Sequence, residues 1–305
     1  MTGNLAGLHV PNRERGTTRR QYSVTGDIVA FQRCRRQYGL LAVRGYVPAH
    51  PVQFYFGTLI HQVLDRAHGH YAGMPDPSTQ GQLPTAADIE VFFDEVDESL
   101  RLRNIAPVSR TRAKGERQAA LQRLLAFNRI EGPTLYPRVR DTEHRLQADR
   151  GAYFLHGTVD VLADAPGLLP GVEVEIWDYK GGACPERGSN EMGQYEFQML
   201  VYCELFRQRN GYLPSRAVLY FLGELAHAAD VTARPPRALI QVPISENGIA
   251  DALRQFDRTV ERIETCLRED SWPAPGEGEG PDEASCTICD FRWQCDARHY
   301  GLRYP

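Results

Sequence analysis

Hydrophobic positions recur along much of the chain with the spacing of an amphipathic helix. Leu59, Val63 and Ala67, for example, follow one another at intervals of four residues and would share one helix face. The same periodicity, with Gly and Pro at its breaks, predicts several helical stretches. They cover residues 23–44, 54–71, 85–130, 191–209 and 246–268.

The centre of the chain changes to the alternation that is typical of β-strands. In the segment GVEVEIWDYKGG, Val174 and Ile176 alternate with other residue types before a Gly-Gly turn. A small mixed sheet with helices before and after it is expected, which predicts the α/β or α+β class. The expected strands cover residues 143–148, 152–163, 171–180, 216–222 and 237–242.

Composition excludes several classes of protein. The 305 residues are 42% hydrophobic and 24% charged, as in ordinary globular proteins. No run approaches the roughly 18 apolar residues that span a membrane, and residues 1–20 lack the apolar core of a signal peptide. We therefore expect a cytoplasmic protein with no membrane segment.

The basic residues are unevenly distributed and are almost all arginines. The formal charge is −4, yet residues 1–50 hold eight arginines and residues 101–150 hold twelve basic side chains. These segments could form one electropositive surface along a polyanion, or they could be solvated helix faces and a frayed tail. Only Lys114 and Lys180 are lysines, and neither follows a glycine, so a P-loop ATPase or helicase is excluded.

The predicted strand over residues 171–180 carries a candidate site at its end. Asp178 and Lys180 point to the same side of that strand, and Asp160 lies beside Asp178 if the neighbouring strand pairs with it. Two carboxylates form a hard oxygen site for Mg²⁺ or Mn²⁺, and an ammonium suits a substrate phosphate or an attacking water. This is the chemistry of phosphodiester hydrolysis. A surface salt bridge between Asp178 and Lys180 is the alternative.

These residues resemble a known family, the PD-(D/E)XK nucleases, and within it the RecB-like branch. Asp160 matches the first acidic position of the family, and Asp178 and Lys180 match its (D/E)-x-K motif. Three further motifs of the branch are present, and all of them stand in the family's order. They are Gly57-x-x-x-His61-x-x-Leu64, Gly157-x-x-Asp160 and Gln198-x-x-x-Tyr202.

The resemblance implies a restriction-endonuclease-like core with a divalent metal site. His61, Asp160 and Asp178 would bind one or two Mg²⁺ or Mn²⁺ ions, assisted by the backbone carbonyl of Tyr179. A histidine on a helix is also commonly structural, and Asp160 could be an ordinary solvent-facing carboxylate. Glu143, at the start of the first strand, is a further candidate acidic ligand.

The resemblance also assigns roles to three polar side chains near the metal. Lys180 would position or activate the attacking water and offset charge that develops on the phosphate. Gln198 and Tyr202, which share a helix face at i and i+4, would help to place the DNA strand. The alternative is that a helix packed on the sheet simply buries the tyrosine and exposes the glutamine.

Four cysteines resemble the ligand set of iron–sulfur nucleases of the RecB-like branch. Cys286-x₂-Cys289-x₅-Cys295 is a compact metal-ligand cluster without a fourth ligand, which Cys34 is the candidate to supply. In AddB-type nuclease domains and CRISPR-adaptation nucleases such a set holds a [4Fe–4S] cluster, and a Cys₄ zinc site is the alternative. The cluster would also hold three arginines near the path of the DNA: Arg33, Arg35 and Arg36.

The expected organisation is one nuclease domain with added segments. Residues 1–22 would be a flexible basic segment, and residues 23–270 a PD-(D/E)XK nuclease domain with a helical insertion at about 72–140. Residues 271–305 would contain a linker and the iron–sulfur module that Cys34 completes.

The expected function is that of a metal-dependent deoxyribonuclease. The resemblance implies exonuclease-like activity on single-stranded or frayed DNA, beside a separate helicase or within a DNA repair, recombination, antiviral defence or CRISPR-adaptation complex. Two alternatives stay open at this point. One is a catalytically inactive, metal-stapled subunit that binds nucleic acid, and the other is a zinc-stabilised structural protein.

Overall fold

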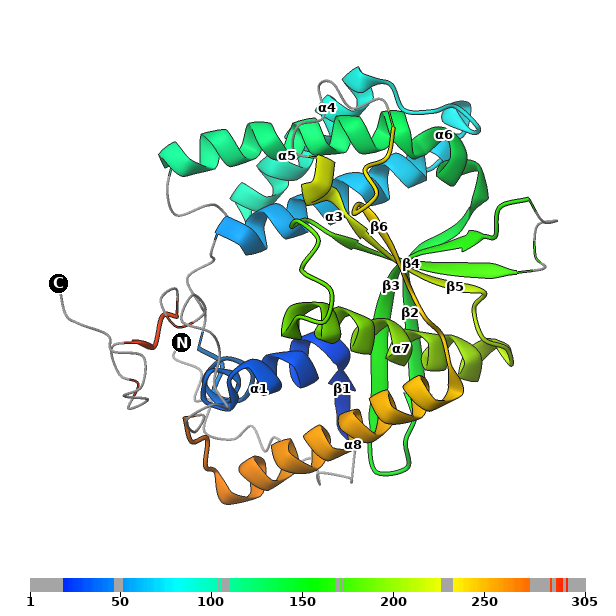
Figure 1. Cartoon of the computed structure of the whole chain (residues 1–305). Coiled ribbons are helices and arrows are strands. Elements are labelled where there is room, and N and C mark those ends of the chain that lie inside the picture. Colours follow the sequence, from blue (N-terminus) through cyan, green and yellow to red (C-terminus); the bar gives the residue numbers. More distant parts are fainter. Residues whose placement is uncertain are drawn as a thin grey trace, which may run out of the picture.

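The computed structural model places helices on both faces of one mixed β-sheet (Figure 1). It describes residues 19–46, 52–103, 105, 110–167, 171, 173–225, 233–274, 286, 289–292 and 295, with the backbone alone at residues 52–54 and 110–113. Residues 1–18 of the predicted N-terminal segment and most of the cysteine-rich end lie outside the described residues.

Six strands form the sheet within the described part of the chain, and β3 pairs with three of the others. The strands are β1 (Gln21–Ser23), β2 (Val139–Asp149), β3 (Phe154–Asp164), β4 (Val174–Lys180), β5 (Arg216–Phe221) and β6 (Leu239–Val242). Antiparallel β2 runs along one edge of β3. On the other edge, β3 pairs with parallel β1 at its start and with antiparallel β4 at its end. β5 is parallel to β4 and antiparallel to β6, so the sheet is mixed, as expected.

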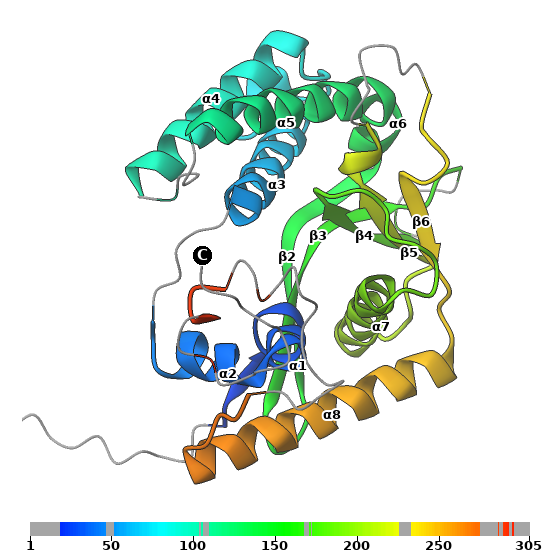
Figure 2. The ribbon, with the colours of Figure 1, turned by 60° about the vertical axis from the view of Figure 1, so that its left-hand side comes forward.

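The helices form two layers, which Figures 1 and 2 show from two sides. α3, α4 and α5 cover one face of the sheet, and α1, α7 and α8 cover the other. Side chains cap three of the longer helices at their first turns: Thr85, Ser189 and Ser245. The helices are α1 (Ala30–Arg33), α2 (Arg35–Tyr38), α3 (Val52–Tyr71), α4 (Ala86–Leu102), α5 (Arg110–Ile130), α6 (Gly132–Leu135), α7 (Asn190–Asn210) and α8 (Glu246–Glu269). Short helical turns are η2 (Val24–Val29), η3 (Gly39–Val43), η4 (Pro77–Thr79), η5 (Tyr136–Arg138) and η6 (Leu222–Leu225).

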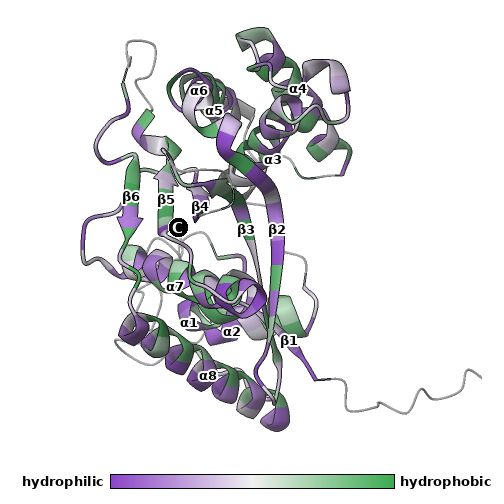
Figure 3. Cartoon of the chain, turned by 90° about the vertical axis from the view of Figure 1, so that its right-hand side faces the viewer, coloured by the Kyte–Doolittle hydropathy of each residue, from purple (hydrophilic) through white to green (hydrophobic). Residues whose placement is uncertain are grey.

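Alternation along the strands builds a separate core against each helical layer. On β4, Ile176 belongs to the core beneath α7 and α8, whereas Trp177 and Tyr179 belong to the core beneath α3 and α5. The amphipathic α8 buries residues that recur every three or four positions, and its outer surface is hydrophilic in Figure 3. The two faces that were expected for the strand over residues 171–180 are therefore present.

The long hairpin of β2 and β3 changes the layer that it faces near Asp160. Leu155 and Val159 contribute to the core beneath α7 and α8, but Val161 and Ala163 contribute to the opposite core. Asp160 thus lies at the point where β3 passes from one core to the other.

None of the helices in the described part is long and apolar enough to cross a membrane.

Residues 23–44 do not form one continuous helix, so that prediction is wrong. Ser23 ends β1, and the helical backbone is interrupted at Cys34, which has φ −158° and ψ 105°. The extended backbone turns the thiol toward the next turn, where Cys34 Sγ accepts a hydrogen bond from the Gln37 N–H group at 3.4 Å. The segment therefore consists of η2, α1, α2 and η3.

Residues from both ends of the described chain pack together beside α1. The Trp272 ring lies 6.4 Å from that of Phe31 and 5.8 Å from that of Tyr38. Gly39 makes this approach possible, because a Cβ atom there would lie 2.3 Å from the Trp272 ring. The aromatic group joins the helices that follow β1 to the segment that follows α8.

Candidate active site

A cavity of about 410 Å³ opens where β3 and β4 separate, between α3 and α7. The pairing of the two strands ends at Val161 and Trp177, one residue before the predicted acidic positions. The cavity brings together the side chains that the sequence motifs singled out. Among the residues that line it are His61, Asp160, Asp178, Lys180, Gln198 and Tyr202.

Asp160 is held by contacts from two different elements. Its Oδ2 accepts a hydrogen bond from the backbone N–H of Tyr179 at 2.6 Å, and its Oδ1 lies 3.4 Å from Nδ1 of His61 on α3. Burial would raise the pKa of Asp160, but His61, the Tyr179 N–H and Lys180 together lower it. Burial would lower the pKa of His61, but the charge of Asp160 outweighs burial and raises it to about 9.

Asp178 lies in a buried network with Lys180 and α7. Lys180 Nζ lies 2.6 Å from Asp178 Oδ2 and donates to Gln198 Oε1 at 2.8 Å. Gln198 Nε2 donates to Asp178 Oδ1 and to the Tyr202 hydroxyl, both at 2.9 Å. Gln198 is 4% exposed, so the alternative of an exposed glutamine on this helix is wrong. The side-chain amide fixes the relative positions of three neighbours.

Two side chains, Asp178 and Tyr195, interact with the charge of Lys180. Burial raises the pKa of Asp178; the positive charge of Lys180 opposes this rise, and the negative charge of Asp160 adds to it. The Lys180 ammonium also lies 4.5 Å from the centre of the Tyr195 ring, within the range of a cation–π contact. Its side chain is 15% exposed, so the surface salt bridge that was the alternative is not what the structure contains.

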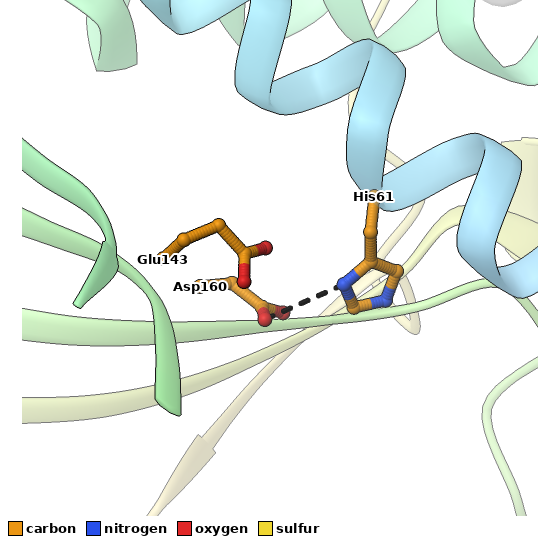
Figure 4. Close-up of side chains that lie close together, drawn as sticks. All are labelled: His61, Glu143 and Asp160. Carbon is orange, nitrogen blue, oxygen red and sulfur yellow. Dashed lines mark ion pairs between the residues drawn. The ribbon is translucent and has the colours of Figure 1, made fainter. Parts of the chain in front are cut away.

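Glu143 on β2 approaches the carboxylate of Asp160, which also contacts His61 (Figure 4). Ligand atoms of His61, Glu143 and Asp160 lie within 4.8 Å of one another. Partial desolvation, followed by the charge of Asp160, raises the pKa of Glu143. Carboxylate oxygens with one imidazole are donors that suit Mg²⁺ or Mn²⁺, so the residues present fit a divalent cation.

Steric contact explains why a glycine stands at the first position of the G-x-x-D motif. A Cβ atom at Gly157 would lie 2.5 Å from Cε1 of Tyr202. The tyrosine ring therefore packs directly on the backbone of β3, three residues before Asp160. This contact sets the distance between α7 and the strand that carries the carboxylate.

His68, two turns after His61 on α3, has a structural position. It is 3% exposed, and its Nε2 is hydrogen-bonded to the Tyr179 hydroxyl at 2.9 Å. Burial lowers the pKa of His68 to about 3, so the imidazole is neutral. Tyr179 thus connects two sites: its backbone N–H binds Asp160, and its ring anchors β4 beneath α3.

Sequence reasoning missed several polar residues of the cavity wall, among them Thr25, His156 and Thr158. Thr25 lies at the start of η2, and His156 and Thr158 precede Asp160 on β3. The two β3 residues alternate with buried positions, and this period of two could have revealed them. Thr25 carried no such signal, because the short strand before it was not predicted.

The four predicted cluster cysteines come from both ends of the chain. Gln37 donates through its backbone N–H to Cys34 Sγ and through Nε2 to Cys289 Sγ, each at 3.4 Å. Burial raises the pKa of the Cys34 thiol, and Cys289 and Cys295 raise it further. Among the described residues, no three cysteine sulfurs lie within 4.8 Å of one another, whereas sulfurs around one zinc ion lie about 3.8 Å apart.

The arginines around Cys34 differ in their surroundings. Arg33 is exposed at the end of α1, and its charge acts on Tyr195, the residue whose ring covers Lys180. Arg35 and Arg36 are partly buried in α2.

The mixed sheet thus presents, in one cavity, carboxylates that suit a divalent cation beside a buried lysine. The model of the PD-(D/E)XK nuclease superfamily matches residues 23–296. The chain belongs to the PD-(D/E)XK nuclease superfamily.

A solved structure supports the same fold. A candidate exonuclease from Eubacterium rectale superimposes with a TM-score of 0.54 at 13% sequence identity, over 100% of this chain and 96% of that chain. The protein SSO0001 superimposes with a TM-score of only 0.33 at 13% identity, over 89% of this chain and 97% of that chain. A search of curated proteins gave no match.

Proposed function

We propose that the chain is a Mg²⁺- or Mn²⁺-dependent deoxyribonuclease. The observation that carries this proposal is the buried pair of Asp178 and Lys180 beside Asp160, in a cavity that opens to solvent. His61, Asp160 and Asp178, with the backbone carbonyl of Tyr179, would hold the cation. When bound, such an ion polarises a phosphoryl oxygen and lowers the pKa of a water molecule.

The remaining side chains orient the reactants. Lys180 is held by Asp178 and Gln198, so that its ammonium can position the attacking water and offset charge on the phosphate. The amide of Gln198 is held in turn by the Tyr202 hydroxyl. These contacts restrict the lysine to one position, and pre-organised charge of this kind is a large part of catalysis.

Hydrolysis of end-labelled DNA with Mg²⁺ or Mn²⁺ tests the proposal. Asp178→Asn and Lys180→Ala are expected to lower the rate on the order of a hundredfold or more. Lys114→Ala removes the other lysine, which is exposed on α5, and should cut like the wild type. A metal-loaded wild type that cuts nothing, or a Lys180→Ala variant that cuts normally, would contradict the proposal.

We further infer an exonuclease mode on single-stranded or frayed ends, beside a separate helicase or a repair, recombination or defence complex. The RecB-like motifs support this inference, and the sequence contains no G-K-[ST] loop for an ATP-driven motor. Labels at the 5′ or 3′ end, on single strands and on blunt or frayed duplexes, distinguish the possibilities. Circular single strands that are cut as fast as linear ones would overturn the exonuclease mode.

We also propose that Cys34, Cys286, Cys289 and Cys295 hold an iron–sulfur cluster. The contacts of Gln37 with Cys34 and Cys289 support a shared site for sulfurs from the two ends of the chain. Four cysteines are the usual ligand set of a [4Fe–4S] cluster, and a structural zinc ion is the competing occupant.

A further inference from the structure

The cavity continues from Asp160 along β3 toward the start of η2. His156, Thr158 and Asp160 alternate with buried positions of the strand, and all three line the cavity. β1 pairs with β3 so that Ser23 lies directly across from His156, which brings η2 beside this end of the cavity. Figure 1 shows β1 and α1 beside one half of the β2–β3 hairpin and α3 beside the other half. Thr25 of η2 lines the same cavity and completes a polar wall with His156 and Thr158.

The polar groups of this wall are without partners among the residues that the structure describes. The side chains of Thr25, His156 and Thr158 make no hydrogen bond and no ion pair in that part of the chain. The surroundings of Lys180 differ, because a carboxylate and an amide already contact its ammonium. The two hydroxyl groups and the imidazole can therefore bind a ligand without giving up a contact of their own.

Hydrogen-bond donors of this kind suit a phosphate group. Each threonine hydroxyl can donate one hydrogen bond, and so can the imidazole of His156. Among the described residues, the acidic side chains that line the cavity are Asp160 and Asp178, which we assign to the cation. The carboxylate of Asp27 on η2 accepts hydrogen bonds from two hydroxyl groups and does not line the cavity. Polar side chains without a competing carboxylate commonly bind DNA phosphates.

Thr158 is separated from Asp160 by a distance that suits neighbouring phosphates of one strand. Two residues of an extended β-strand span about 7 Å, which is close to the length of one nucleotide in an extended DNA strand. A phosphate that binds at Thr158 would therefore be the neighbour of a phosphate that lies at Asp160.

We propose that Thr25, His156 and Thr158 bind the phosphate next to the one that is cleaved. The DNA strand runs from the carboxylates along β3 toward η2. This inference rests on the proposed nuclease function and deepens it, because it gives the bound strand a direction across the sheet. Contacts with phosphate are the same for every base sequence, and they hold the cleaved bond in place beside Asp160 and Asp178.

Binding of single-stranded DNA to the full chain tests the site. Every protein carries Asp178→Asn so that the DNA stays intact, and fluorescence anisotropy gives the Kd of labelled oligothymidylate and oligoadenylate. Thr158→Val and His156→Phe should each raise the Kd on the order of tenfold, equally for both oligonucleotides. Thr158→Ser keeps the hydroxyl and should bind like the reference protein. Thr265→Val is the matched control, since Thr265 lies on α8 outside the cavity and donates to Glu261, and it should also bind like the reference protein.

A substrate with one uncharged linkage identifies the phosphate that is bound. With Asp178 intact and Mg²⁺ or Mn²⁺ present, a methylphosphonate one linkage from the cleaved bond, on one of its two sides, should slow cleavage by the wild type. The same linkage should add little to the loss that Thr158→Val already causes, because the variant lacks the hydroxyl that binds there.

The outcomes separate this site from the proposed function. Thr158→Val and His156→Phe proteins that bind like the reference protein overturn the proposal, and so do losses that depend on the base. If these variants lose binding but the wild type cuts no DNA, the phosphate site stands and the proposed function fails. If the wild type cuts DNA and both variants bind normally, the reverse holds.

Discussion

The backbone N–H of Tyr179 donates to Oδ2 of Asp160 over 2.6 Å, across the gap where β3 and β4 separate. An N–H that would otherwise pair with the neighbouring strand binds a carboxylate instead. The hydrogen bond satisfies a buried donor and favours the charged form of Asp160. The end of strand pairing thus both opens the cavity and orients its central carboxylate.

Substitution of Gln198 should reduce activity and stability together. Gln198→Ala removes the amide that contacts Asp178, Lys180 and Tyr202, so the lysine is no longer confined. We expect kcat to fall on the order of a hundredfold and the free energy of unfolding to fall by about 1–3 kcal/mol. Steady-state cleavage and urea unfolding would measure both effects.

Gln194, one turn earlier on α7, provides the control for this prediction. It is partly exposed and lies outside the network of Asp178 and Lys180. Gln194→Ala should change neither quantity appreciably. Equal losses in the two variants would mean that the helix, rather than the amide contacts, accounts for the effect.

A methyl group at Gly157 should destabilise the fold. In Gly157→Ala, the new Cβ would lie 2.5 Å from Tyr202 Cε1, so the ring or the strand must move. Overpacking of this kind costs about 1–3 kcal/mol, which thermal unfolding would detect. The Gly157→Ala substitution should cost less in a Tyr202→Ala background than in the wild type, because the smaller side chain leaves room for the methyl group.

Gly193 is the matched glycine for this test. It lies within α7 with nothing within 4 Å of the position of an added Cβ. Gly193→Ala should stabilise the chain by about 0.5–1 kcal/mol, because alanine is the better helix former. A Gly157→Ala variant that is as stable as the wild type would show that the ring does not pack as described.

Stability should decline as the pH falls below about 6.5, and His68 is one cause. Its folded pKa of about 3 is below the ordinary value of 6.5, so the unfolded chain binds a proton that the folded chain excludes. Between these pH values the contribution of His68 falls by about 1.4 kcal/mol per pH unit. It is fully retained above pH 6.5.

Urea unfolding at several pH values would measure this slope. His68→Gln keeps a polar group near the Tyr179 hydroxyl but cannot take up a proton, so its slope between pH 4 and pH 6 should be shallower. An unchanged slope in His68→Gln would mean that other groups cause the acid sensitivity.

Loss of Cys34 should release the metal of the cysteine site. Cys34→Ser, purified without oxygen, should contain much less iron and acid-labile sulfide than the wild type and lack its visible absorption. Cys266→Ser is the control, since Cys266 is also partly buried but packs at the edge of the core beneath α8. A colourless wild type that contains zinc would contradict the iron–sulfur assignment.

The strand that carries Asp178 and Lys180 was predictable because its signals are local. Alternation assigned both residues to one face, and the structure places both beside Asp160 in one cavity. The scarcity of lysine made Lys180 conspicuous before any contact was known. Alternation requires only neighbours along the chain, which is why it succeeded here.

Other features depend on contacts that neighbouring residues do not encode. The interruption at Cys34 is accompanied by contacts of Gln37 with Cys289, far away along the chain. β1 has three residues, too few to show a period. The position of Glu143 follows from a left-handed backbone that glutamate itself does not favour. Tertiary structure determines each of these features.

The packing of Trp272 against Gly39 also constrains when the cavity can form during synthesis. Thr25 of η2 lines the cavity, and the ring that packs on the helices following η2 is made more than two hundred residues later. A growing chain that still lacks Trp272 has the carboxylates and the lysine, but lacks this contact behind part of the wall. This part of the wall can therefore be completed only after Trp272 has been synthesised, so full assembly of the site comes well after synthesis of its carboxylates and its lysine.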